Sequence, residues 1–179
     1  KQKLDEIVVD LLRIDCPPAD LSEWDRVVEA HKFPKNKIKL YMVGKYMELL
    51  DAYKSLNEAL IHAGIHTSTE VDVTFLDSEE IERKGVEILS DADAILVPGG
   101  FGARGFEGKI AAAGYARTQQ IPFLGICYGL HAAIIEYARN VCGLEGADTT
   151  ENNPNTPHPI IGLITEWVDE DGNKEFRDI

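Results

Sequence analysis

The feature that most constrains the fold is the stretch Phe-Leu-Gly-Ile-Cys-Tyr-Gly-Leu at residues 123–130. A short apolar run leads into Gly-x-Cys-x-Gly and then into a helical pattern, which is the layout of a G-x-S-x-G nucleophile elbow with sulfur in place of oxygen. Gly125 and Gly129 flank Cys127 at two residues on either side and let the backbone pass close to its neighbours. The pattern predicts a strand, a tight turn that exposes Cys127, and a helix that begins at about Tyr128.

This arrangement favours a nucleophilic cysteine. The positive end of the following helix favours a thiolate at Cys127, and the Tyr128 amide is expected to stabilise an oxyanion. The alternative is a cysteine buried at a strand end, which is the usual role of a single cysteine. The motif alone favours the nucleophile only modestly, so a second part of the site is needed.

A glycine-rich loop upstream supplies that second part. Residues 94–97 are Ala-Ile-Leu-Val, which predicts a buried parallel strand, and Pro-Gly-Gly-Phe-Gly follows. Loops at the carboxyl ends of strands form the ligand crevice of open α/β sheets, and glycines there present bare amides. We expect Gly100 and Tyr128 to contribute two amides to one oxyanion, whereas the alternative is an ordinary flexible turn.

Five segments together resemble the class I glutamine amidotransferase domain of CTP synthases. They are VPGGFGARGFEGK, PFLGICYGLHAAIIEYARNV, VGKY, DAYKS and PNTPHP. The resemblance extends over essentially the whole chain and keeps the order of the motifs. It implies that Cys127 hydrolyses glutamine through a thioester, and that the ammonia serves the ATP-dependent amination of UTP to CTP.

The same resemblance implies where the other components lie. Residues 1–37 would be the tail of a synthase domain with its connector, and residues 38–179 the amidotransferase domain, incomplete at its C-terminus. ATP and Mg²⁺ would bind the synthase domain of the same chain, so no cofactor is expected in this segment. GTP would be an allosteric activator, L-glutamine the substrate, and the full-length enzyme a cytoplasmic homo-oligomer.

The resemblance also assigns the glutamine pocket. Glu151 matches the loop acid that receives the α-amino group of glutamine, with a solvated loop residue as the alternative. The family's Leu-Gly-Met-Gln, which lines the glutamine site, corresponds to Tyr128, Gly129, Leu130 and His131. Backbone contacts at the first two positions are expected to persist, while the polarity of the pocket changes.

A second group of residues matches the rim that the family uses for the guanine nucleotide and for gating ammonia. These residues are Lys45, Tyr46, Phe101 and Arg104. They fall on loops at the predicted carboxyl edge of the sheet. The alternative for the basic members is a simple solvated side chain.

The general base is not found in the sequence. Class I amidotransferases supply it in a late His-x-Glu, but no histidine here has Glu two residues later; the five are His31, His62, His66, His131 and His158. Only 52 residues follow Cys127 (179 minus 127), so the chain is expected to stop before the pair. Such a domain should bind glutamine better than it hydrolyses it.

Two other functions remain open. One is an amidotransferase-like binding or regulatory module that no longer hydrolyses glutamine, because it lacks the His-x-Glu. The other is a peptidase-like α/β hydrolase with a cysteine elbow. In that group a histidine directly follows the nucleophile, where this chain has Tyr128.

Charge and cysteine content argue against several classes of protein. Lys and Arg number 18 against 31 Asp and Glu, and the net charge of -13 argues against nonspecific nucleic-acid binding and anionic membranes. The three cysteines have no framework spacing, which fits a reducing cytosol. No apolar run has the length of a membrane span, and no cluster has metal-ligand spacing.

The alternation of strand and helix patterns predicts an α/β fold, with a doubly wound, mostly parallel sheet and helices on both faces. Strands are expected at 38–43, 71–77, 94–97, 121–126 and 160–167, with a hairpin turn at 170–173. Helices are expected at 4–12, from Ser22 as cap to about 28, at 52–62 closed by Gly64, and at 78–90, 109–117 and 128–141. Residues 30–37 are predicted to be a linker and 147–159 a loop.

Overall fold

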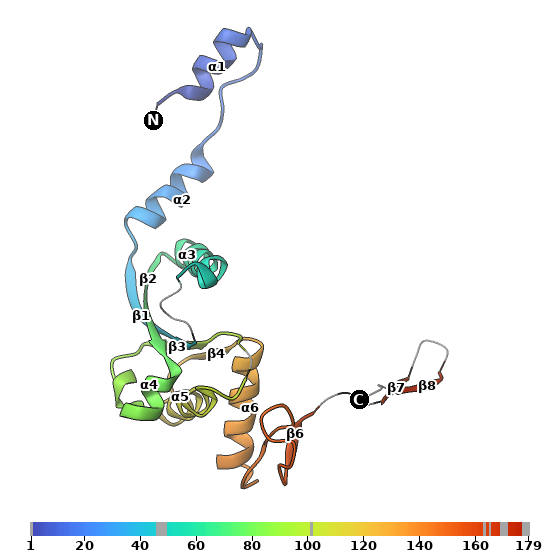
Figure 1. The fold of residues 1–179 in the computed structure, drawn as a ribbon. Helices are drawn as coiled ribbons and strands as arrows, with labels where there is room; N and C mark the ends of the chain where they lie inside the picture. The colour runs from blue at the N-terminus through green and yellow to red at the C-terminus, as the bar shows by residue number, and fades with distance from the viewer. Residues whose placement is uncertain are drawn as a thin grey trace. The chain divides into compact units, whose positions relative to one another are not determined.

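The computed structural model describes residues 2–45, 50–100, 102–162, 164, 166–168 and 172–176 (Figure 1). The chain divides into two compact units. The first comprises Lys1–Lys37 and Ser55–Glu70, and the second comprises Ile38–Lys54 and Val71–Ile179. The assignment of residues 1–37 to a neighbouring domain stays a prediction.

The first unit is helical. It holds α1 (Leu4–Leu12), α2 (Ser22–Lys32) and nearly all of α3 (Lys54–Thr67), and neither α1 nor α2 has a buried residue. The predicted cap at Ser22 is wrong, because Ser22 is already helical and its N–H donates to Asp20 Oδ1 at 3.0 Å. The predicted end at Gly64 is also wrong. Gly64 is buried inside α3, and the chain leaves the helix at Ser68, with φ 51°.

Four strands form the central sheet in the order β2-β1-β3-β4. Their bounds are β1 (Asn36–Gly44), β2 (Thr69–Asp77), β3 (Ala94–Val97) and β4 (Phe123–Gly125). β3 runs parallel to both neighbours, and Ile95 lies beside Tyr41 on β1 and Phe123 on β4. The chain builds outward from β1 to β2 and then returns to the other side of β1. The carboxyl ends of β1 and β3 therefore flank the point where the winding reverses, which is where such sheets bind ligands.

The core covers both faces of this sheet. Ile95, Leu96 and Val97 are each at most 1% exposed, and neighbouring residues of a strand point to opposite faces. One cluster consists of Tyr41, Val43, Ile81, Leu89, Ile95, Val97, Ala112 and Ala116. A second lies between α5 (Phe106–Gln119) and α6 (Tyr128–Asn140) and consists of Phe106, Ile110, Tyr128, Ala132 and Ile135. The predicted α/β class is confirmed.

The helix predicted at 78–90 is two shorter elements, α4 (Ser78–Lys84) and the 3-10 helix η2 (Val86–Leu89). Gly85 separates them at φ 88°, a left-handed conformation that breaks the helix. Asp77 caps α4 by accepting the Glu79 N–H at 2.9 Å. A second 3-10 helix, η1 (Leu50–Tyr53), stands where the start of α3 was predicted.

The C-terminal part contains two small sheets. The loop predicted at 147–159 begins and ends in the parallel pair β5 (Asp148–Thr149) and β6 (Pro159–Ile161). The hairpin β7 (Glu166–Val168) and β8 (Lys174–Phe176) is antiparallel, as predicted, although positions 170 and 171 of its turn lie outside the described residues. The single strand predicted at 160–167 is wrong, since Gly162 and Ile164 belong to neither sheet.

Two features are absent from the residues that the structure describes. No helix there has the length and apolar character to cross a membrane. The same residues contain no group of three or more His, Cys, Asp or Glu side chains placed to hold a metal ion.

Candidate active site

Cys127 occupies the sharp turn between β4 and α6. Its backbone has φ 54° and ψ -114°, and its side chain is exposed. Positive φ is rare for a residue with a side chain, and such strain is often found at functional sites. The exposure of Cys127 and the start of α6 at Tyr128 confirm the predicted elbow geometry, while the role of Cys127 as nucleophile stays a prediction.

Close backbone contacts explain both glycines of the elbow. A Cβ on Gly125 would lie 2.5 Å from the Gly129 carbonyl oxygen, and a Cβ on Gly129 would lie 2.0 Å from the Val97 oxygen. No side chain fits at either distance. The glycines therefore let the first turn of α6 lie directly against the ends of β3 and β4.

The glycine loop after β3 lies beside Cys127. A Cβ on Gly99 would be 3.4 Å from the Cys127 Cβ and 3.7 Å from its Sγ. Gly99, which the sequence did not single out, is thus the loop residue that the structure places against the cysteine. Gly100 follows with φ 133°, and its role as an oxyanion donor stays a prediction, as does that of the Tyr128 amide.

Lys109 is a residue of this region that the sequence did not reveal. It lies in the first turns of α5, is 0% exposed, and donates from Nζ to the Gly100 carbonyl at 3.2 Å. Burial lowers the pKa of Lys109 to about 8, with a further decrease from Lys45 and an opposing effect of Cys127. No pattern in the sequence marks Lys109, because the burial of this residue and its neighbours on α5 is seen only in the structure.

The Tyr128 side chain lies in the core. Tyr128 is 0% exposed, and its ring packs at a centroid distance of 4.6 Å on Phe106. Its hydroxyl donates to Asn152 Oδ1 at 2.7 Å, so the residue links the elbow to the loop that carries Glu151. Burial raises the pKa of the Tyr128 hydroxyl, and the charge of Glu151 raises it further.

The other predicted pocket residues follow along the first turn of α6. Leu130 is 51% exposed, and its N–H donates to the Cys127 carbonyl at 2.9 Å. His131 lies with its ring 5.4 Å from that of Tyr128, and its Nδ1 is buried without a hydrogen-bond partner. These residues are therefore close to the elbow, and their contact with glutamine stays a prediction.

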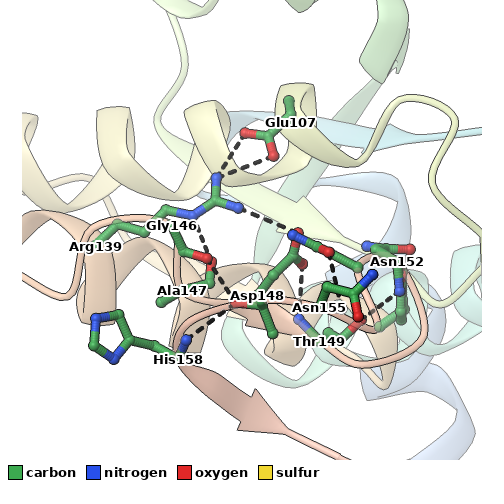
Figure 2. A network of polar contacts seen from close by, with 12 residues as sticks. Glu107, Arg139, Gly146, Ala147, Asp148, Thr149, Asn152, Asn155 and His158 are labelled. Carbon is green, nitrogen blue, oxygen red and sulfur yellow. Dashed lines mark hydrogen bonds and ion pairs between the residues drawn. The ribbon is translucent and has the colours of Figure 1, made fainter.

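A polar network holds the start and end of the loop that carries Glu151 (Figure 2). Arg139 on α6 donates to the Ala147 carbonyl at 2.7 Å, pairs with both Glu107 oxygens at 3.0 and 2.8 Å, and lies 3.5 Å from Asp148. The Asp148 N–H donates to the His158 carbonyl at 3.2 Å. His158 thus takes part in this loop through its backbone. Glu151 itself is exposed.

Residues 48–173 match the family model of the glutamine amidotransferase class-I domain. The chain belongs to the class I glutamine amidotransferase family. It is also similar to the solved structure of the Trypanosoma brucei CTPS glutaminase domain with bound acivicin, with a TM-score of 0.67 and 36% identity. That match covers 71% of this chain and 50% of the other, so this amidotransferase spans half the length of its relative.

Of the four residues predicted to form the effector rim of the amidotransferase, the structure describes Lys45 and Arg104. Lys45, at the end of β1, is buried rather than solvated, and its Nζ donates to the Gly102 carbonyl at 2.7 Å. Burial lowers the pKa of Lys45, and Arg104 lowers it further. Arg104 is exposed and pairs with Glu79 at 2.9 Å. Tyr46 and Phe101 lie outside the described residues, and the effector role of all four stays a prediction.

The five histidines of the sequence are the candidates for a general base. All five lie within the described part of the chain, and none of their side chains hydrogen-bonds to Cys127 there. The contact between His131 and Cys127 is made by the backbone, from the His131 N–H to the Cys127 carbonyl at 3.3 Å. The structure therefore places an exposed cysteine beside a glycine loop, and its general base stays unidentified.

Proposed function

We propose that this amidotransferase is the glutaminase half of a CTP synthase and that Cys127 is its nucleophile. The observation that carries the proposal is the exposed, strained Cys127 at the start of α6, with Gly99 directly against it. The similarity to the Trypanosoma brucei CTPS glutaminase domain supports it. A nucleophile at a turn of this kind is open to a substrate that enters at the carboxyl edge of the sheet.

The reaction has two halves. The Cys127 thiolate attacks the γ-carboxamide carbon of glutamine, and the amides of Gly100 and Tyr128 stabilise the negative oxygen. The carbon–nitrogen bond then breaks, nitrogen takes a proton from a general acid, and ammonia leaves a glutamyl thioester. Water hydrolyses the thioester to glutamate and restores the thiol. Class I members use a His-x-Glu as acid and base, and this sequence has none after Cys127.

Substrate binding is assigned to the turn and loop that meet at Tyr128. We propose that Glu151 receives the α-amino group of glutamine and that positions 128 and 129 contribute backbone contacts. Leu130 and His131 then line the pocket. The hydrogen bond from Tyr128 to Asn152 supports this arrangement, since it ties the elbow to the residue after Glu151.

The wider reaction is proposed from similarity alone. The ammonia would pass to a synthase domain of the same chain, where ATP and Mg²⁺ serve the amination of UTP to CTP. GTP would activate through Lys45, Tyr46, Phe101 and Arg104. The complete enzyme would be a cytoplasmic homo-oligomer.

The test is covalent labelling with a chloroketone analogue of glutamine, followed by peptide mass spectrometry. We expect label on Cys127, protection by excess glutamine, and no label in Cys127→Ser. Cys142→Ser is the matched control, because Cys142 is also an exposed thiol and its loss should leave labelling unchanged. Absence of label, or label only on Cys16 or Cys142, would contradict the proposal.

A second candidate is a glutamine-binding module without hydrolysis. The specific observation in its favour is that no histidine of the sequence has Glu two residues later. Ammonia release from glutamine separates the two functions. Release above that of Cys127→Ser supports the glutaminase, whereas labelling at Cys127 without release supports the binding module.

A further inference from the structure

The hydroxyl of Tyr128 connects the elbow to the loop that carries Glu151. Tyr128 directly follows Cys127, is 0% exposed, and donates from its hydroxyl to Asn152 Oδ1 at 2.7 Å. Asn152 in turn directly follows Glu151 in the chain. The leucine that the family has at position 128 carries no hydroxyl and cannot make this bond. The hydrogen bond therefore depends on the tyrosine of this chain and needs an explanation of its own.

The Tyr128 ring is fixed between α5 and α6. It packs on Phe106 at a centroid distance of 4.6 Å and lies 5.4 Å from the His131 ring. The Lys109 Nζ lies 5.6 Å from its centroid, and the ring belongs to the buried cluster between the two helices. Because packing locks the ring, it also holds the hydroxyl in one position at the start of α6.

Asn152 belongs to a tight turn that includes Glu151. The Asn152 N–H donates to Thr149 Oγ1 at 3.1 Å, and the Asn153 N–H donates to the Thr149 carbonyl at 3.0 Å. Thr149 is 2% exposed, so the turn starts from a buried residue. The two bonds close the backbone around Glu151, and a displacement of Asn152 would therefore displace Glu151 as well.

The side chain of Asn152 relies on Tyr128 for its hydrogen bonding. Its Nδ2 is buried and has no hydrogen-bond partner within the part of the chain that the structure describes. The Arg139 network in Figure 2 holds a different part of the loop, at Ala147 and Asp148. Tyr128 thus fixes the turn itself, whereas Arg139 fixes the start of the loop.

We propose that Tyr128 is a positioning residue for Glu151: its hydroxyl holds Asn152 and so keeps the neighbouring carboxylate at the site for the α-ammonium group of glutamine. The proposal rests on the proposed glutaminase function, in which Glu151 receives that group. A carboxylate on a fixed turn loses less conformational entropy when it binds a cation than one on a free turn. Tyr128 therefore contributes to the selection of glutamine over amides that lack an α-amino group.

The experiment compares L-glutamine with glutaramate, which is glutamine without its α-amino group. Each ligand is tested for protection of Cys127 from alkylation by iodoacetamide, in the full chain with Cys16→Ser and Cys142→Ser, so that Cys127 is the sole thiol. The measured quantity is the ligand concentration that halves the alkylation rate, which requires no turnover of glutamine. In the parent we expect glutamine to protect at lower concentrations than glutaramate, because only glutamine presents a cation to Glu151.

Tyr128→Phe removes the hydroxyl and keeps the ring that packs on Phe106. We expect the half-protecting concentration of glutamine to rise about fivefold, the effect of losing one hydrogen bond worth about 1 kcal/mol, and that of glutaramate to stay constant. Asn152→Ala removes the acceptor and should raise the glutamine value by a similar factor, with no further rise in the double variant. Tyr137→Phe, at an exposed tyrosine of the same helix, is the matched control and should change neither value.

Failure of the proposal and failure of the glutaminase function give different results. If glutamine is preferred in the parent, but Tyr128→Phe raises the values of both ligands equally or of neither, the positioning role is wrong and the glutaminase function is unaffected. If glutamine protects the parent no better than glutaramate, the proposed glutamine site is wrong and the positioning role is overturned with it.

Discussion

At the scale of single residues, Gly129 is the position on which the elbow packing most directly depends. The Cβ of Gly129→Ala would lie 2.0 Å from the Val97 oxygen, which is backbone and cannot turn aside. The start of α6 must then move away from β3, and we expect the free energy of unfolding to fall by about 3 kcal/mol. Urea denaturation of the purified variant measures this loss.

The control for Gly129 is Gly162→Ala. Its Cβ would meet the nearest atom, on Thr150, at 3.7 Å, which is an ordinary contact. Its unfolding free energy should change by no more than about 0.5 kcal/mol. Equal losses in the two variants would show that the glycine of the elbow is not required by close packing.

The sequence predicted those residues of the site whose identity follows from local backbone geometry. Gly125, Cys127 and Gly129 belong to this class, since the turn itself requires glycine on both sides of an exposed cysteine. Lys109 and Gly99 were missed, because their importance depends on contacts between β3, α5 and α6. A lysine in a helical pattern predicts a solvated side chain, and only the tertiary structure shows that this one is buried.

At the scale of elements, two ion pairs of different burial connect α5 and α6. In the first pair, Arg117 lies 2.8 Å from Glu136, whose side chain is 3% exposed. In the second, Arg139 lies 2.8 Å from Glu107, whose side chain is 62% exposed. We expect Glu136→Gln to lower the unfolding free energy by about 2 kcal/mol, the worth of hydrogen bonds to a buried charged group. Glu107→Gln, the matched control, should cost at most about 0.5 kcal/mol. Equal losses of unfolding free energy in the two variants would show that burial of Glu136 does not strengthen its ion pair.

The stabilisation that the Glu136 carboxylate provides depends on pH in a defined direction. The hydrogen bond from Arg117 holds the pKa of Glu136 below its ordinary value of 4.5. The stabilisation is therefore fully present above 4.5 and is lost as pH falls through the lowered pKa of the folded state. The difference between the parent and Glu136→Gln should narrow below about pH 4.5 in urea titrations.

Element types were predicted more accurately than their bounds. β3 and α6 were predicted almost to the residue, because a buried apolar run and a strong helical stripe mark them. Two of the errors fall at glycines: Gly64 is inside α3, whereas Gly85 ends α4. Glycine is compatible with both roles, and packing of the surrounding elements decides which one is adopted.

At the scale of the whole molecule, the alternation of strands and helices was enough to predict a doubly wound sheet. It could not predict the strand order β2-β1-β3-β4, which depends on which strand pairs with which. That order is what places the carboxyl ends of β1 and β3 side by side, with Lys45 and the glycine loop following them. The position of the site was therefore predictable from motifs, and the contacts of Lys45 and Lys109 with the glycine loop were not.

The net charge of -13 leads to a prediction for the entire chain. Charges of one sign repel within a compact fold, and salt shortens the Debye length from about 30 Å at 0.01 M to about 10 Å at 0.1 M. If screening gains about 1 kcal/mol, Tm at pH 7 should rise by about 2–4 °C between these salt concentrations. Sodium and potassium chloride should act alike, and the gain should vanish near the sequence pI of 4.7, where repulsion is smallest. A fall in Tm with salt at pH 7 would mean that attractive ion pairs, such as Arg117 with Glu136, outweigh the repulsion.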